Sequence, residues 1–217
     1  APLSDDLGHA ILPERTVHYD YLVIAVGSVS NDFNTPGIKE HCYFLDSNQQ
    51  AERFQHTLLD SFTRLHQDDN QQQSLNIAIV GAGATGVELS AELYHVSELL
   101  KLYGLTNMSS KRLHIHLIEA GPRILPALPE RIAISAKREL LKLGVNVREQ
   151  TQVKEASAQG FITKDDEHIN ADIMLWAAGV KAPDFIKDLA VFELTRSNQI
   201  QVNQFLQSTV DDSIFVL

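Results

Sequence analysis

Cysteine is almost absent from the sequence, because Cys42 is the only one among 217 residues. A disulfide framework, a cysteine-rich zinc site and a redox centre built from two cysteines are therefore excluded within this chain. A single free cysteine usually behaves as a small buried apolar side chain. We therefore expect Cys42 to be a buried, unreactive thiol.

Basic residues are scarce as well. Lys and Arg number 18 against 28 Asp and Glu, which gives a formal net charge of −10. Binding to nucleic-acid phosphates needs clustered Lys and Arg, and anionic membrane surfaces attract basic segments. The charge balance therefore argues against both nucleic acid and an anionic membrane surface as partners.

Long apolar runs are missing too. The stretch 173–180, Ile-Met-Leu-Trp-Ala-Ala-Gly-Val, is far shorter than the about 20 residues that a spanning helix needs. The chain does not start with the basic, apolar and small-residue order of a signal peptide. Its hydrophobic content of 44% and charged content of 21% are ordinary for a globular protein. We therefore expect a soluble chain.

The sequence does contain a glycine motif where a strand gives way to a helix. An apolar, β-branched run over 76–80 is followed by Gly81, Gly83 and Gly86, which have the G-x-G-x-x-G spacing of dinucleotide-binding turns. In such turns the first glycine bends the chain, the second lets backbone approach a pyrophosphate, and the third lets the helix pack on the strand. The free N–H groups at the helix start then bind the phosphates. A glycine-rich structural turn is the alternative interpretation.

The periodicity around this motif predicts alternating strands and helices, and so an α/β fold. Ser47 is a plausible N-cap and Gly144 a plausible C-cap. Polar loops are expected over 67–74 and 106–110. Helices are expected over 47–65, from the glycine turn to about 104, and over 129–143; strands over 19–28, 113–119, 145–148, 171–176, 199–202 and 213–217; and a small antiparallel meander over 153–170.

Glu119 follows the strand after the glycine turn, where a carboxylate can accept hydrogen bonds from ribose hydroxyls. Its distance from Gly86 exceeds the about 20 residues of the usual fingerprint, and the long helix with the 106–110 loop accounts for the excess. A strand-end acid in solvent is the alternative. Because a carboxylate repels a 2′-phosphate, we expect NAD over NADP, although Arg123 lies close enough to weaken that preference.

Three further features are open to two interpretations each. Glu88 lies in the first turn of the helix, either as an acid that the helix dipole favours or beside the ribose or nicotinamide. Residues 177–180 end another strand at the same sheet edge, where small side chains either admit a flat ring or serve packing. His114 and His116 share a strand face but lack a third metal ligand at suitable spacing, so we expect a solvated or hydrogen-bonded pair.

Together these stretches resemble two-dinucleotide-domain flavoproteins, most closely type II NADH:quinone oxidoreductases. The matching stretches are 19–28, 81–88, 117–126 and 175–183. In that family the chain starts in an FAD domain, crosses into an NADH domain and returns. The resemblance implies a Rossmann-like parallel sheet with helices on both faces and a small meander, flanked by partial FAD-domain strands. It places a partial FAD-binding domain at 1–35, the NADH-binding domain at 36–197, and the return at 198–217.

The resemblance also implies which residues contact the cofactor. The glycines would cradle the pyrophosphate of NADH, Glu119 would hold the adenosine ribose, and Glu88 with the Ala178-Gly179 turn would border the nicotinamide. No catalytic side chain and no metal is expected, because the flavin carries the hydride chemistry. The expected cofactor-binding set is Gly81, Ala82, Gly83, Ala84, Thr85, Gly86, Glu88, Glu119, Ala120, Ala178, Gly179 and Val180.

The parent enzyme would pass hydride from NADH to FAD and electrons on to quinone, as a peripheral protein on the cytoplasmic side of a membrane. The family's N-terminal FAD glycine motif and C-terminal quinone region are missing from this sequence. We therefore expect a fragment that binds NADH weakly and is inactive alone, with a homodimer as a further expectation. The alternatives are the NADH domain of a ferredoxin or nitrite reductase component, and a non-catalytic NADH-sensing module.

Overall fold

The computed structural model describes residues 3–4, 10–12, 16–68, 73–105 and 110–217. The chain divides into two compact units, of which Ser28–Lys181 is one and Ala1–Gly27 with Ala182–Leu217 is the other. Within the first of these units, the central unit, residues 29–30 pair with residues 180–181. The domain bounds at 36 and 197 stay predictions. The assignment of the two units to FAD and NADH binding stays a prediction.

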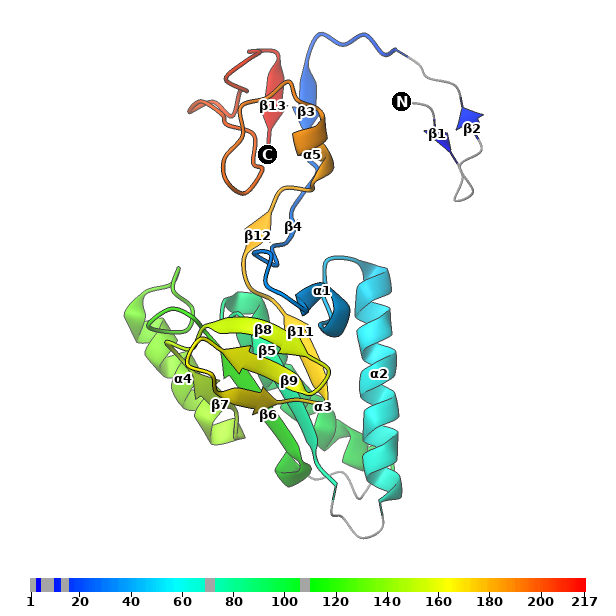
Figure 1. Ribbon diagram of the computed structural model, residues 1–217, viewed down its shortest axis with the longest axis vertical. Coiled ribbons are helices and arrows are strands. Elements are labelled where there is room, and N and C mark those ends of the chain that lie inside the picture. Colours follow the sequence, from blue (N-terminus) through cyan, green and yellow to red (C-terminus); the bar gives the residue numbers. More distant parts are fainter. Residues whose placement is uncertain (1–2, 5–9, 13–15, 69–72, 106–109) are drawn as a thin grey trace. The chain divides into compact units, whose positions relative to one another are not determined.

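A four-stranded parallel sheet forms the centre of the unit Ser28–Lys181 (Figure 1). Its register places Ile77 beside both Ile173 and Ile115. The near-continuous apolar sequences of 75–80 and 173–176, the two neighbouring strands, reflect a sheet that is covered on both faces. Across the sheet the order is β11 (Ile173–Trp176), β5 (Leu75–Val80), β6 (Leu113–Ile118) and β7 (Asn146–Arg148).

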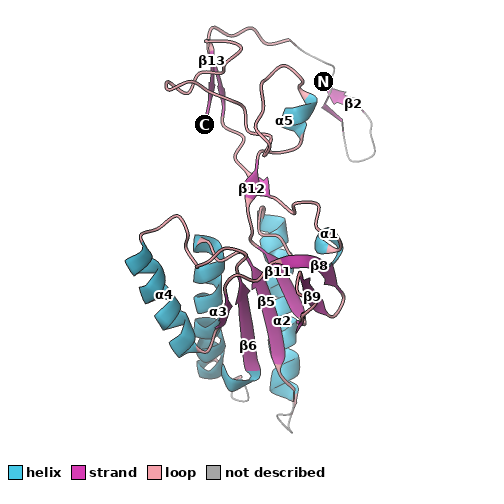
Figure 2. Ribbon diagram, turned by 60° about the vertical axis from the view of Figure 1, so that its left-hand side comes forward, coloured by secondary structure: helices cyan, strands magenta, loops and turns pink. Residues whose placement is uncertain are grey.

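Three long helices share one hydrophobic core with one face of this sheet (Figure 2). Ile77, Ile79 and Leu117 contribute from the strands, and Phe62, only 1% exposed, contributes from the first of the three helices. Apolar residues at three- and four-residue spacing give the first and third of these helices the stripe that they bury, whereas the middle helix buries small and polar residues such as Gly86 and Ser90 beside Leu93. The helices are α2 (Asn48–Gln67), α3 (Ala84–Leu102) and α4 (Glu130–Leu143).

The antiparallel meander and a short helix cover the opposite face. Ala78, Val80 and Trp176 alternate with the residues of the first face and pack in a second core with Phe161 and Ile38. The meander consists of β8 (Val153–Ser157), β9 (Gly160–Thr163) and β10 (His168–Asn170), and the helix is α1 (Ile38–His41).

The α/β class, the parallel sheet and the meander are thus confirmed, and the helix ends lie close to their predicted positions. The Ser47 hydroxyl accepts a hydrogen bond from the Gln50 N–H at 3.3 Å, so Ser47 caps α2 as predicted. Gly144 ends α4 in the left-handed conformation, with a φ of 99°. A 3-10 helix, η1 (Ser110–Arg112), leads into β6. The predicted loops at 67–74 and 106–110 fall largely outside the described residues.

The other unit contains short elements. Only Leu22–Ile24 (β3) of the predicted strand 19–28 is extended in a ladder, and it pairs in parallel with β13 (Ile214–Val216). Residues 199–202 form isolated bridges instead of the predicted strand. The remaining elements here are β1 (Leu3–Ser4), β2 (Ala10–Leu12) and α5 (Phe185–Asp188), while β4 (Val29–Ser30) and β12 (Val180–Lys181) belong to the central unit. Within the described ranges, every helix falls short of what a membrane crossing requires in length or apolar content.

Replacing Gly86 by alanine tests how closely α3 packs on the glycine turn. A Cβ at Gly86 would lie 2.0 Å from the backbone oxygen of Gly81, whereas a Cβ at Gly83 would meet nothing within 4 Å. We expect Gly86→Ala to lower the free energy of unfolding by about 1–3 kcal/mol, the usual range for overpacking. Urea denaturation, followed by fluorescence of the buried Trp176, measures the effect. Equal midpoints for Gly86→Ala and the control Gly83→Ala would contradict this packing.

Candidate functional site

In the glycine turn, the space beside Gly81 and Gly86 is filled by neighbouring backbone, whereas the space beside Gly83 is open. At Gly81, with a φ of 104°, a Cβ would lie 2.6 Å from the carbonyl group of Ala177, so the end of β11 packs directly against the turn. Around Gly83 the space is open. The first helical hydrogen bond of α3 runs from the Val87 N–H to the Gly83 carbonyl at 3.1 Å, so N–H groups before Val87 lie at the helix terminus. The turn therefore presents backbone donors and a bare α-carbon to the same space.

The Glu119 carboxylate is directed at this turn. Its Oε2 accepts a hydrogen bond from the Ala82 N–H at 2.9 Å, and its Oε1 accepts one from the Gly121 N–H at 2.7 Å. The Ala82 carbonyl in turn accepts a hydrogen bond from the Leu125 N–H at 2.8 Å. Because both polar ends of Ala82 are bonded to the segment that follows β6, the glycine turn and that segment form one fixed structure.

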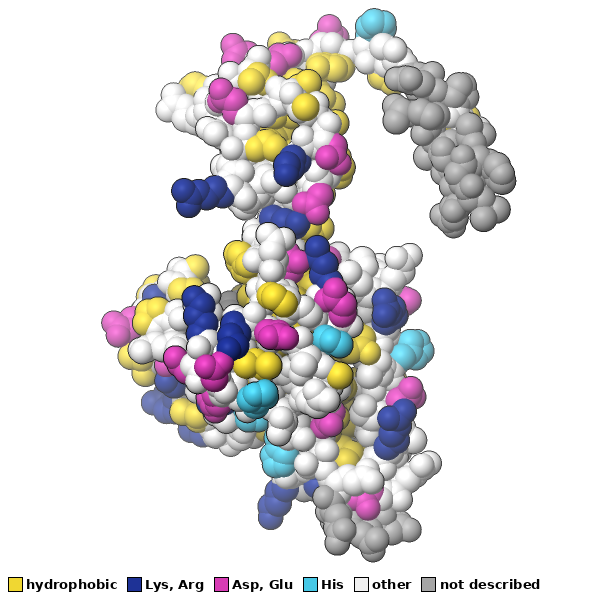
Figure 3. Space-filling view, viewed as in Figure 1, with side chains coloured by type: hydrophobic (Ala, Val, Ile, Leu, Met, Phe, Trp, Pro, Cys, Tyr) yellow, Lys and Arg dark blue, Asp and Glu magenta, His cyan; other side chains and the backbone are white. Residues whose placement is uncertain are grey.

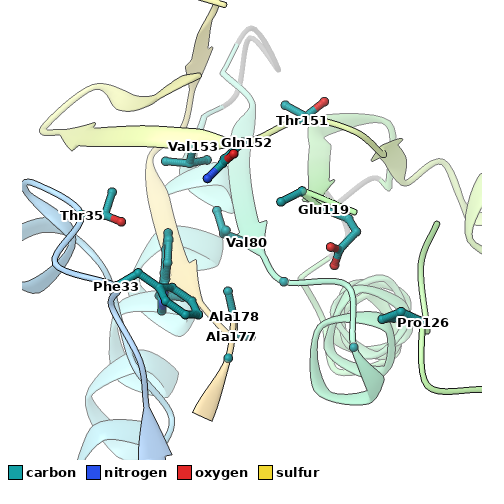
Figure 4. Close-up of a pocket in the computed structure, with 15 residues that line it drawn as sticks. Phe33, Thr35, Val80, Glu119, Pro126, Thr151, Gln152, Val153, Ala177 and Ala178 are labelled. Atoms are coloured by element: carbon teal, nitrogen blue, oxygen red, sulfur yellow. The ribbon is translucent and has the colours of Figure 1, made fainter. Parts of the chain in front are cut away.

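A cavity of about 480 Å³ lies at the carboxyl ends of β5, β6 and β11. Figure 4 shows Glu119 and Pro126 on one side of it and Phe33, Ala177 and Ala178 on the other. Ligands of open α/β sheets bind at this edge. The structure brings together six residues of the expected cofactor set around the cavity: Gly81, Gly83, Glu119, Ala120, Ala178 and Gly179.

The other six expected residues lie outside the cavity lining. Ala82 and Gly86 are buried in the turn, where Ala82 is bonded to Glu119 and Gly86 packs on Gly81. Ala84, Thr85 and Glu88 are exposed in the first turns of α3, and Val180 is exposed in β12.

Sequence reasoning missed several residues of the cavity wall. Thr151, Gln152 and Val153 lie above Val80 in Figure 4. They follow β7, so the rule that ligands bind beyond the carboxyl ends of parallel strands could have indicated them. Phe33 also lines the cavity, and the turn-forming residues around it gave no sign of this role.

Arg123 braces its own loop. Its terminal nitrogens donate hydrogen bonds to the backbone oxygens of Leu125, Pro126 and Leu128, each at 2.9 Å, with a fourth contact to Ile124 at 3.5 Å. A guanidinium group has four N–H bonds on these two nitrogens, so all four are directed at carbonyls. The terminal N–H groups of Arg123 therefore already have backbone acceptors and are not directed at a ligand phosphate.

The histidines of β6 and the single cysteine are not arranged as a metal site in the described residues. His116 Nδ1 lies 3.2 Å from the Asn146 side-chain amide, and burial followed by the charge of Arg148 lowers the pKa of His116. His114 is exposed. In the part of the chain that the structure describes, no three His, Cys, Asp or Glu side chains are arranged to hold a metal ion. Cys42 is partly buried, and its burial raises the pKa of the thiol to about 12.

Charges of both signs are interspersed on the surface of the central unit. On the face that Figure 3 shows, Lys and Arg side chains lie among Asp and Glu side chains. Opposite charges of the central unit also form ion pairs, such as those of Arg148 with Glu167 and of Lys137 with Glu149. This face therefore lacks the basic stripe that nucleic-acid binding requires.

The sequence is similar to known proteins along its whole length. The profile of the family "Pyridine nucleotide-disulphide oxidoreductase" matches residues 8–217. The chain is 46% identical to the type II NADH:quinone oxidoreductase of Haemophilus influenzae, in a match that covers 100% of this chain and 52% of that protein. The corresponding protein of Staphylococcus aureus is 30% identical, with 92% of this chain and 50% of that protein covered. The resemblance stated from the motifs is confirmed, and the chain spans about half the length of these relatives.

Solved structures share the fold. NDH2 from Plasmodium falciparum in complex with NADH matches with a TM-score of 0.79 at 22% identity, over 98% of this chain and 45% of that one. A ferredoxin reductase from Rhodopseudomonas palustris matches with a TM-score of 0.69 at 17% identity, over 99% of this chain and 48% of that one. These matches show a shared fold, and a shared fold does not by itself identify what this chain acts on.

The raised pKa of Cys42 predicts slow alkylation. The thiolate is the reactive form, and a pKa of about 12 leaves very little of it at pH 8. We expect iodoacetamide at pH 8 to modify Cys42 at least about a hundredfold more slowly in the folded chain than in urea, with the rate rising as pH increases toward the raised pKa. Intact-mass spectrometry measures both rates. Equal rates in the folded and unfolded chain would contradict the environment described here.

Proposed function

Because the chain belongs to the pyridine nucleotide-disulphide oxidoreductase family, we propose that its central unit binds NADH. We further propose that the whole protein passes hydride from NADH to FAD and then electrons to a quinone. The observation that carries the proposal is the cavity in which the open point at Gly83 and the Glu119 carboxylate lie together. The 46% identity to a type II NADH:quinone oxidoreductase supports the quinone as acceptor.

The pyrophosphate fits the open point of the turn. The missing Cβ of Gly83 leaves room for phosphate oxygens to approach the backbone, and the start of α3 supplies N–H donors and the positive end of the helix dipole. Ala84 and Thr85 belong to this helix start and would contribute through their backbone N–H groups. Substitution at Gly83 would therefore act on the ligand, in contrast to substitution at Gly86.

The adenosine ribose fits beside Glu119. Each carboxylate oxygen already accepts one backbone N–H, and each retains a further lone pair for a ribose hydroxyl. The negative charge disfavours a 2′-phosphate, and Arg123, directed at backbone carbonyls, does not compensate for it. These two observations support NADH over NADPH.

The nicotinamide would then lie at the other side of the cavity, near Ala178 and Gly179. When bound, the flavin accepts the hydride. The residues of this chain would bind NADH, orient its ring and exclude water, and no side chain has to donate or accept a proton in that step. The roles of Glu88 and Val180, which lie outside the cavity lining, stay predictions.

The location and the assembly of the whole protein are further proposals. We propose that the whole protein is a peripheral protein on the cytoplasmic side of a membrane; the lipid solubility of a quinone acceptor supports the membrane attachment. The homodimer expected from the resemblance stays a prediction, as do weak NADH binding and lack of catalysis by this chain alone.

Replacing Glu119 by alanine tests the assignment of the ribose. Hydrogen bonds to a charged group contribute about 1.5–3 kcal/mol, so we expect NADH affinity to fall about ten- to hundredfold and the preference over NADPH to narrow. Titration calorimetry of both nucleotides measures this. Glu52→Ala, which removes an exposed acid of α2, is the matched control. The assignment is wrong if Glu119→Ala and Glu52→Ala bind NADH equally well while both remain folded.

A further inference from the structure

Phe33 is an exposed aromatic residue in a backbone conformation that bulky side chains rarely adopt. Its φ is 51°, in the left-handed region, and the residue is 59% exposed. Non-glycine residues persist in this region when the surrounding structure dictates it, and such residues cluster at functional sites. Hydrophobic burial does not explain the arrangement, because more than half of the side chain is left in solvent.

Hydrogen bonds of Asn31 connect this turn to the end of β11, and none of them involves the Phe33 ring. The Phe33 N–H donates to the Asn31 side-chain oxygen at 3.0 Å. The Asn31 N–H donates to the Gly179 carbonyl at 3.3 Å, and the Asn31 carbonyl accepts from the Trp176 indole N–H at 2.8 Å. The backbone of Phe33 is thus held in place, which fixes the point from which its side chain extends.

The ring lies on the bare α-carbon of Gly179. A Cβ at Gly179 would lie 2.4 Å from Cζ of Phe33, so the two positions are compatible only because residue 179 is glycine. Phe33 and Gly179 both line the 480 Å³ cavity. Figure 4 shows the Phe33 ring beside Ala177 and Ala178, across the cavity from Glu119 and Pro126. An aromatic surface therefore forms the wall opposite the carboxylate.

We propose that the Phe33 ring is the wall against which the nicotinamide ring of NADH packs, and that Phe33 is a positioning residue for hydride transfer. This inference rests on the proposed function. If Glu119 holds the adenosine ribose and Gly83 the pyrophosphate, the opposite end of the dinucleotide extends toward Ala178, Gly179 and the Phe33 ring. Aromatic rings prefer offset-stacked or edge-to-face contacts, so a fixed phenyl ring would restrict the tilt of the nicotinamide.

The test compares two ligands that differ by the nicotinamide ring. NADH and ADP-ribose share the adenosine, the pyrophosphate and the second ribose, so loss of the Phe33 ring should affect only NADH. In Phe33→Asn the ring is removed while the left-handed conformation is retained, because Asn tolerates it. We expect this variant to bind NADH about three- to tenfold more weakly than wild type, the range for one aromatic pair. Its affinity for ADP-ribose should be unchanged.

Two further variants make the result specific. Phe33→Tyr keeps the ring and should bind NADH as wild type does. Tyr103→Asn removes an aromatic side chain that is 83% exposed at the end of α3 and should bind both ligands as wild type does. Titration calorimetry on the full 217-residue chain gives all the affinities, and circular dichroism shows whether each variant is folded.

The outcomes separate this inference from the proposed function. If wild type binds NADH and Phe33→Asn loses affinity for NADH alone, the nicotinamide wall is supported. If Phe33→Asn weakens NADH and ADP-ribose equally, or weakens neither, the wall is refuted while NADH binding stands. If wild type binds neither ligand at millimolar concentration, the proposed function fails, and the role of Phe33 fails with it.

Discussion

The hydrogen bond from the Ala82 N–H to the Glu119 carboxylate is the contact on which the site depends. It joins the ends of two neighbouring parallel strands, and the Leu125 N–H completes the connection by bonding to the Ala82 carbonyl. Arg123 keeps the intervening loop in shape through its bonds to backbone carbonyls. The turn that would receive the phosphates is therefore preorganised before any ligand arrives, which lowers the ordering cost of binding.

The two cores of the sheet explain why the site is at its carboxyl edge. Long helices fill one face and the meander with α1 fills the other, so strand side chains are buried on both sides. Backbone groups and small residues beyond the strand ends, such as Gly83 and Ala178, remain partly accessible there. Phe33 lines the cavity at this edge although it is far in sequence from β11. It lies there because Asn31 forms hydrogen bonds with Gly179 and Trp176. Packing thus leaves a cavity at this edge of the sheet, where we propose that the dinucleotide binds.

Local patterns in the sequence predicted the framework well and the cavity wall poorly. Spacing of apolar residues located α2 and α4, Ser47 and Gly144 marked their ends, and the G-x-G-x-x-G motif located the turn. The strand over 19–28 was predicted too long, because apolar composition does not show where ladder partners end. The hydrogen bonds of Arg123 depend on carbonyls that converge only in the folded loop, and the placement of Phe33 depends on contacts between residues 145 positions apart, such as Trp176 with Asn31. Such features leave no local signature.

A crystal structure of this chain with NADH tests the central claim most directly. The account predicts pyrophosphate oxygens at the start of α3 next to Gly83, with the adenosine ribose hydroxyls on the Glu119 carboxylate. NADH bound elsewhere on the chain, or bound in this cavity with its ribose away from Glu119, would contradict it.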